Sequence, residues 1–207
     1  MIDILIGIHI IFGSLALLSG AMVLMLRKGN PTHKGIGKLY VISGTLGTIV
    51  SLIIASSPGH YSLFLFTLGI LTLYFLIGGF FAFRISTKQL KGLSLTMIVT
   101  SAVMMLYAFY LFFQAMYFSG GVLIFCGLIG LSNAYLVDYN IFVKQGTKFK
   151  ARHRTSLHIS KMIGSYIAMT TAFVVVNNIL YFSILNWIIP ALMGGFLIRH
   201  FIRANRE

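Results

Sequence analysis

The sequence predicts an all-α protein, a polytopic bundle of seven transmembrane helices that forms a single integral membrane domain over residues 1–207. Of the 207 residues, 58% are hydrophobic and only 9% are charged, whereas a soluble domain carries about 25% charged residues. The hydrophobic residues fall into segments of the length that a helix needs to cross a bilayer, about 20 residues. In addition, the Lys and Arg residues gather in alternate connections between these segments.

Seven apolar segments follow one another along the chain. Apolar runs above about 18 residues are too long for the strands of a membrane barrel, so each segment is read as a helix. The expected spans cover about residues 4–26, 38–56, 62–84, 94–116, 120–143, 156–178 and 181–201.

Helix-breaking or polar residues separate the segments. The first five separators, in chain order, lie at residues 27–31, 57–60, 91–92, 119–121 and 144–146. The sixth consists only of a few residues around Asn177 and Asn178, which makes it the weakest boundary. Six spans is therefore the alternative count.

The basic residues predict the orientation of the chain. All 16 Lys and Arg residues lie in or beside the first, third and fifth connections and the C-terminal tail, with Lys161 inside the sixth span near its cytoplasmic end, and the other three connections contain none. Because cytoplasmic loops are enriched in Lys and Arg, this pattern predicts an N-terminus outside and a C-terminus in the cytoplasm. A count of six would divide the basic residues between the two faces, so the pattern favours seven spans.

The same residues give a formal net charge of +13 and a pI near 10.1. In a soluble protein this excess would suggest a nucleic acid partner. In an apolar chain it indicates orientation and attraction to the anionic inner leaflet instead. We therefore expect a multipass protein of the cell membrane, the inner membrane of a bacterium, with the lipid bilayer and no nucleic acid as its partner.

The ionisable residues singled out inside the expected spans are His9, Asp138, His158 and Lys161. Such residues are costly in a bilayer and are functional candidates for that reason. Asp138 and Lys161 lie at similar distances from the cytoplasmic ends of their spans, so Asp138 is expected to pair with Lys161 or with His158. That pair would be a structural ion pair, a proton relay, or a carboxylate that orients a ligating histidine.

Histidines also gather at the cytoplasmic margin, where His33 and His153 join the deeper His158. Neutral imidazole is a ligand for haem iron, zinc and copper. His9 lies on the same helical face as Gly13 and Gly20, which predicts that it points toward a neighbouring helix or a flat ligand. The sequence contains no motif of a P-loop, zinc protease, serine hydrolase or c-type haem attachment, so these classes lack support.

Three motifs of the chain carry a resemblance to a known group of proteins. They are His9-Ile-Ile-Phe-Gly13, the segment from Thr32 to Tyr40 around His33, and the segment from His153 to His158 followed by Lys161-Met162. On these motifs the chain resembles an uncharacterised family of bacterial multipass "predicted membrane proteins". As a helical bundle with histidines at the ends of spans it is, more distantly, similar to b-type membrane cytochromes, which implies haem b held by histidines on two helices.

Three functions remain open at this point. The first is a haem b redox protein near the cytoplasmic face, with quinone or another redox protein as its electron partner. Its axial ligands would be His33 and His158, with His153 as the alternative. Residues expected to pair with the haem propionates are Lys34, Lys38, Arg152 and Arg154, and Asp138 would orient His158.

The second function is a zinc-dependent membrane hydrolase in which His33, His153 and His158 hold the metal and leave one position for water. The third is a proton- or anion-coupled transporter or sensor that uses Asp138, His158 and Lys161 without a cofactor. The sequence does not decide whether the protein is an enzyme.

Overall fold

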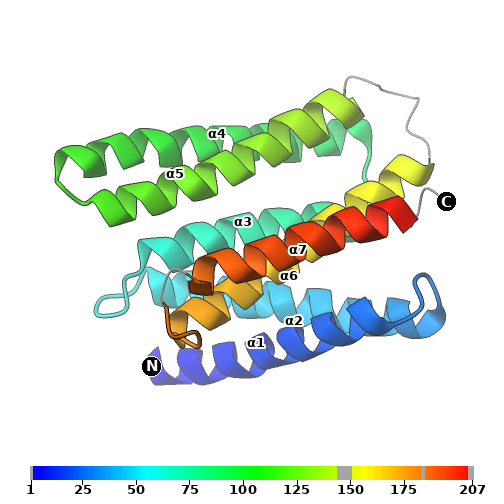
Figure 1. The fold of residues 1–207 in the computed structure, drawn as a ribbon, viewed down its shortest axis with the longest axis horizontal. Coiled ribbons are helices and arrows are strands. Elements are labelled where there is room, and N and C mark those ends of the chain that lie inside the picture. The colour runs from blue at the N-terminus through cyan, green and yellow to red at the C-terminus, as the bar shows by residue number, and fades with distance from the viewer. Residues whose placement is uncertain (1, 144–150, 183–184, 205–207) are drawn as a thin grey trace. The chain divides into compact units, whose positions relative to one another are not determined.

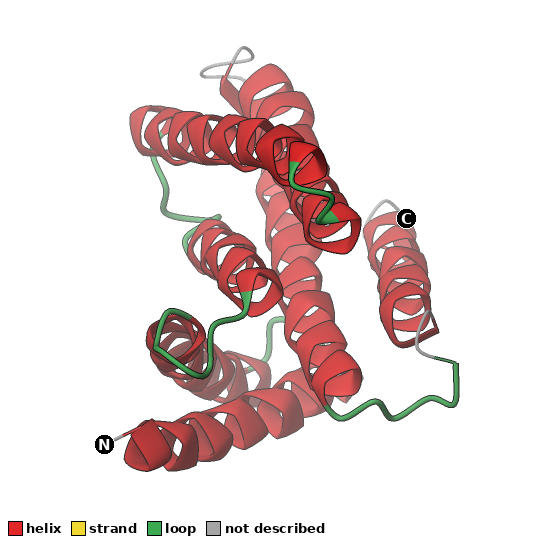
Figure 2. Cartoon of the chain, turned by 90° about the vertical axis from the view of Figure 1, so that its left-hand side faces the viewer, coloured by secondary structure: helices red, strands yellow, loops and turns green. Residues whose placement is uncertain are grey.

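The computed structural model describes residues 2–143, 151–182 and 185–204. Within these ranges the chain forms seven α-helices, one of them continued by a π-helix, and no strand (Figures 1 and 2). Seven helical segments are long and apolar enough to cross a membrane. The all-α prediction is confirmed, and the seven helices suggest a multipass membrane protein in a lipid bilayer.

The helices follow the predicted order along the chain. α5 leads directly into the π-helix η1, and together they form the fifth apolar segment. The bounds are α1 Ile2–Met25, α2 Pro31–Ala55, α3 Leu63–Phe80, α4 Thr87–Phe113, α5 Tyr117–Leu131, η1 Ser132–Val143, α6 Ala151–Val176 and α7 Leu185–Ala204.

Two helices begin seven residues before their apolar segments because polar residues cap them. The Asn30 side chain accepts a hydrogen bond from the His33 backbone N–H at 2.7 Å, and Pro31 occupies the first turn of α2. Ser86 and Gln89 form a capping box at the start of α4. Hydropathy marks only the apolar part of a helix, whereas caps satisfy the first N–H groups and mark where the helix begins.

The sixth connection is wider than the sequence suggests, and α7 begins at Leu185 rather than near residue 181. Asn178 has a positive φ of 45°, a conformation that Asn tolerates better than most residues. The buried Asn186 side chain donates to Asn178 Oδ1 and accepts from the Leu180 N–H, both at 2.9 Å. This amide network holds the turn between α6 and α7.

The π-helix η1 is a feature that apolar patterning does not predict. Its start is marked by two side chains, because Ser132 Oγ and Asn133 Nδ2 both donate to the Ile129 carbonyl at 3.0 Å. Side chains that bond to carbonyls three or four residues back compete with regular helix geometry. π-Helical turns are rare in proteins overall, and a large share of those that do occur lie at functional sites.

The chain divides into two compact units, each described here by itself. Unit 1 consists of residues 1–76 and 162–200, and unit 2 consists of residues 77–161 and 201–207. α3, α6 and α7 contribute residues to both units.

In unit 1, α1 and α2 lie side by side (Figure 1). The backbones approach closely at Gly47, where a Cβ atom would lie 3.3 Å from the Gly13 nitrogen. Small residues at such a position allow two helices to approach closely. Buried Ala16, Tyr40 and Leu76 form the core of the unit.

In unit 2, α4 and α5 lie side by side (Figure 1). Gly127 on α5 faces the Ser101 carbonyl of α4, 3.3 Å from where a Cβ would stand. A second cluster joins the end of α3 and the first half of α6 to the start of α4. Its buried members are Ala82, Ile85, Leu90 and Leu157.

Candidate functional site

Two opposite charges meet inside unit 2. Lys161 Nζ on α6 lies 2.9 Å from Asp138 Oδ2 on η1, and the two side chains are 1% and 0% exposed. This is one of the two pairings expected from the sequence. Burying a single charge is costly, so each of these groups depends on the other for its place in the interior.

Gly78 on α3 makes room for the Lys161 side chain. A Cβ atom at Gly78 would lie 2.6 Å from Lys161 Cδ and 3.5 Å from Leu93 Cδ2. Any side chain at this position would have to displace the aliphatic stem of the lysine. The missing Cβ of Gly78 therefore gives the stem space to bring the ammonium group to Asp138.

His158 lies one turn before Lys161 on α6. Its Nδ1 is 2.8 Å from the Gly79 carbonyl oxygen, and because a carbonyl only accepts, Nδ1 is the donor. In the neutral imidazole this leaves Nε2 as the acceptor nitrogen. The Phe83 ring lies beside the imidazole, with 5.4 Å between ring centroids.

Arg154 ties the first turn of α6 to the chain that follows α3. Its guanidinium donates to the carbonyls of Ala82 at 2.9 Å and Ile85 at 3.2 Å. Carbonyls beyond a helix C-terminus have no partner within that helix, and a cation near them is favourable. Arg154, His158 and Lys161 are spaced by four and three residues, so they lie along one face of α6.

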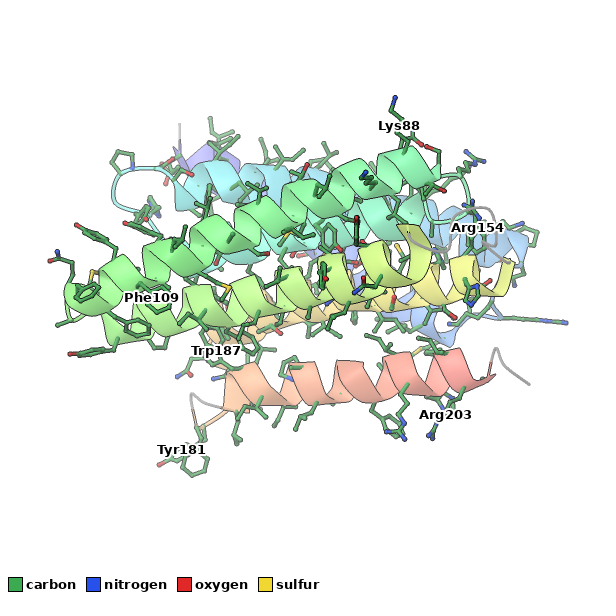
Figure 3. The ribbon with its side chains drawn as sticks, turned by 90° about the horizontal axis from the view of Figure 1, so that it is seen from above. Lys88, Phe109, Arg154, Tyr181, Trp187 and Arg203 are labelled. Atoms are coloured by element: carbon green, nitrogen blue, oxygen red, sulfur yellow. The ribbon has the colours of Figure 1, made fainter. Side chains whose placement is uncertain are left out.

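Basic side chains gather at the Arg154 end of unit 2. Figure 3 shows Lys88 and Arg154 toward the same end, with Phe109 toward the other end of α4. Arg84, Lys88 and Lys91 are exposed. In unit 2, Asp138 is the one carboxylate among the residues that the structure describes.

The other predicted residues lie in both units. In unit 1, His9 Nδ1 donates to the Gly47 carbonyl at 2.9 Å, His33 is half-buried in the first turn of α2, and Lys34 and Lys38 are exposed. In unit 2, His153 is half-buried near the start of α6. Because His33 belongs to unit 1 and His158 to unit 2, their pairing stays a prediction.

Part of the predicted basic margin falls outside the described ranges. These residues are Lys144, Lys148, Lys150 and Arg206, together with the side chain of Arg152. Within the ranges that are described, no group of three or more His, Cys, Asp or Glu side chains is arranged to hold a metal ion. The three-histidine zinc site stays a prediction without structural support.

Sequence reasoning missed three contributors to the site: Gly78, Gly79 and Phe83. Gly78 gives space to Lys161, the Gly79 carbonyl binds His158, and Phe83 contacts its ring. The signal for the first two was present, because adjacent glycines in an apolar helix permit close approach of a neighbour.

The chain matches no protein-family model, no curated protein and no solved structure. The fold and the site define a helical, multipass type of membrane protein with a buried ion pair.

Proposed function

We propose that the chain is a proton-coupled membrane transporter in which Asp138 binds the proton and Lys161 is its counter-charge. The observation that carries this proposal is the Asp138–Lys161 pair, which is 2.9 Å long and enclosed by protein. A proton that binds to Asp138 removes the negative charge and breaks the electrostatic balance of the pair. Ionisable residues inside spans mark ion and proton pathways by default.

Three features favour a functional role over a purely structural one. Hydrophobic residues of similar volume hold helices together as well as a buried ion pair does, so helix packing alone does not call for the charges. Asp138 lies on a π-helix, a backbone form that is frequent at functional sites. His158, whose imidazole can accept and release a proton, lies one turn from Lys161 on α6.

The orientation of the chain and the membrane in which it lies are also part of the proposal. We place the N-terminus outside and the C-terminus in the cytoplasm of a bacterial inner membrane, supported by the distribution of the 16 basic residues. An alkaline phosphatase fusion, which is active only outside the cytoplasm, is expected to be inactive at the C-terminus and active after Ser57. The reverse result would overturn the orientation.

Proton transport is tested with the full-length protein in vesicles of phosphatidylethanolamine and phosphatidylglycerol that contain a fluorescent pH indicator. Equal K⁺ and valinomycin on both sides hold the membrane potential at zero, and KCl is the salt. An imposed pH gradient is expected to decay faster than in protein-free vesicles. A decay equal to that of protein-free vesicles would overturn the proposal.

The double variant Asp138→Asn/Lys161→Met separates transport from folding. It removes both charges together, so it leaves no unpaired buried ion and is expected to fold. Its pH gradient should decay at the rate of protein-free vesicles, while the exposed control Lys88→Met retains wild-type transport. Wild-type transport by the folded double variant would show that the pair is only structural.

A second candidate, haem b binding, is favoured by the hydrogen bond of His158. Metal-ligating histidines commonly donate the second ring N–H to a backbone carbonyl, and His158 does so to Gly79 with Nε2 as the remaining nitrogen. Protein from haem-supplemented cells would then show an absorption band that shifts on reduction and is lost in His158→Ala. A colourless wild-type sample contradicts it, and zinc analysis of that sample tests the three-histidine alternative.

A further inference from the structure

A cluster of basic side chains lies where α3 is joined to α4. It consists of Arg84, Lys88 and Lys91, which are all exposed, and Figure 3 shows the Lys88 side chain projecting away from the helices. We propose that this cluster binds one phospholipid with an anionic head group. The cations bind the phosphate, and aromatic side chains of the same segment contact an acyl chain. The inference goes beyond the proposed proton transport and does not depend on it.

The first step of the argument is that the cluster lacks a counter-charge. Lys88 and Lys91 are three residues apart on α4, so they are neighbours on the helix surface and repel each other. The first turn of α4 contains no acidic residue. Among the described residues of unit 2, the one carboxylate is that of Asp138, which is buried and paired with Lys161. An anion from outside the chain is therefore the group that offsets this repulsion.

The second step is that the structure holds the cluster in place. Arg154 donates to the carbonyls of Ala82 and Ile85, which stand on either side of Arg84 in the sequence. Both of these residues are buried in the core of unit 2, and a capping box fixes the first turn of α4, which carries Lys88. Binding to groups that are already ordered loses less conformational entropy, so the affinity for a ligand is higher.

The third step is that exposed aromatic side chains adjoin the cations. Phe81 and Phe83 lie within three residues of Arg84 and are 44% and 52% exposed. A free phosphate ion has no apolar part to contact these rings, whereas a phospholipid joins an anionic phosphate to apolar chains. The orientation proposed above places this connection at the cytoplasmic leaflet, where basic segments attract anionic lipids.

The basic residues of the α1–α2 connection in unit 1 provide a contrast. Arg27, Lys34 and Lys38 are also exposed, and they match the α3–α4 cluster in the number and type of their charges. Residues 26–38, however, include three glycines and no Phe, Tyr or Trp. This segment therefore offers general attraction to an anionic surface without aromatic rings to contact an acyl chain.

The experiment measures lipid binding to the full-length protein in dodecyl maltoside micelles. Phosphatidylglycerol or phosphatidylcholine is added in steps, and native mass spectrometry gives the fraction of protein that carries one lipid. Wild type is expected to bind phosphatidylglycerol at least about tenfold more tightly than phosphatidylcholine, because each Lys or Arg near a membrane surface adds to the attraction of anionic lipid. Arg84→Gln/Lys88→Gln/Lys91→Gln is expected to lose this preference.

The matched control is Arg27→Gln/Lys34→Gln/Lys38→Gln. It removes the same net charge from exposed positions of unit 1 and is expected to keep the wild-type preference. An equal loss in both variants would mean that net charge alone attracts the lipid, and the proposed site would be wrong. Equal binding of the two lipids by wild type, or an unchanged preference in the α3–α4 variant, would also overturn it.

Glycerol 3-phosphate distinguishes a lipid from a soluble phosphate, because it carries the phosphate without acyl chains. An excess of it is expected to leave phosphatidylglycerol bound, and displacement of the lipid would overturn the lipid assignment. Gel filtration checks that each variant is folded and monodisperse. If the triple variant aggregates, Lys88→Gln/Lys91→Gln takes its place and is expected to lose part of the preference; no loss in this double variant would contradict the proposal.

Discussion

Both units bury hydroxyls that bond within their own helix, as Ser94 does in unit 2, but among the described residues only unit 2 buries a pair of opposite charges. In unit 1 the hydroxyls of Ser43, Thr48 and Thr72 each donate, at 2.7 Å, to the carbonyl four residues back in their own helix. In unit 2 a carboxylate and an ammonium group on different elements satisfy each other. A hydroxyl satisfied within its own helix depends on no other element, whereas each member of an ion pair depends on its partner. Under the proposed function, the interior of unit 2 is therefore where a proton is expected to act.

The exception in unit 1 sharpens the contrast. Tyr40 on α2 and Ser165 on α6 form a hydrogen bond of 2.7 Å between buried side chains. Ser165 Oγ itself donates to the Met162 carbonyl at 2.8 Å, so the Tyr40 hydroxyl is the donor in this bond. Both groups are neutral, and loss of one leaves no buried charge.

The largest expected effect comes from breaking the ion pair on one side. Asp138→Asn leaves a buried, unneutralised lysine and is expected to lower the free energy of unfolding by about 3–5 kcal/mol. Adding Lys161→Met is expected to recover most of that loss. Titration with SDS in mixed micelles measures both values. Equal stability of Asp138→Asn and wild type would remove the contrast between the units.

Arg154→Gln is expected to have the next largest effect, because it removes two hydrogen bonds to the carbonyls after α3. Bonds to a charged donor contribute about 1.5–3 kcal/mol, and the same SDS titration measures the loss. The matched control is Lys88→Gln, an exposed cation on α4 expected to change stability by less than about 0.5 kcal/mol. Similar losses of unfolding free energy for the two variants would mean that the hydrogen bonds from Arg154 to the carbonyls after α3 do not stabilise unit 2.

Tyr40→Phe is expected to have the smallest effect of the three. It removes the hydrogen bond to Ser165 and keeps the ring, at a cost of about 0.5–1.5 kcal/mol. Proton transport in the vesicle assay should be unchanged, since this bond lies in unit 1 and bears no charge. A loss of transport in a stably folded Tyr40→Phe protein would extend the functional site into unit 1.

The sequence predicted the order and number of the helices because crossing a bilayer requires long apolar segments, and these are visible in composition alone. Several helix ends differ from the ends of the expected spans because helix ends depend on caps. The start of α4 depends on Ser86 and Gln89, and the turn before α7 depends on Asn186. Ser86 and Gln89 lie outside the apolar segments that were counted, and Asn186 is a polar residue within the seventh.

The sequence could predict the ion pair because the number of residues from Asp138 and from Lys161 to the cytoplasmic ends of their spans is similar, which places both side chains at a similar depth. The acceptor of His158 could not be derived in this way. The Gly79 carbonyl is a backbone atom whose direction depends on how α3 ends, and Arg154 helps to fix that end through Ala82 and Ile85. The π-helix that carries Asp138 has no apolar period of its own to reveal it.

The scarcity of acidic residues has a practical consequence for labelling. Hydrophobic carbodiimides react with protonated carboxyl groups in apolar surroundings, and of the three acidic residues only Asp138 is buried within the described part of the chain. Covalent modification by such a reagent would therefore occur at one position. The labelling rate at different pH values would follow the occupancy of Asp138 by a proton.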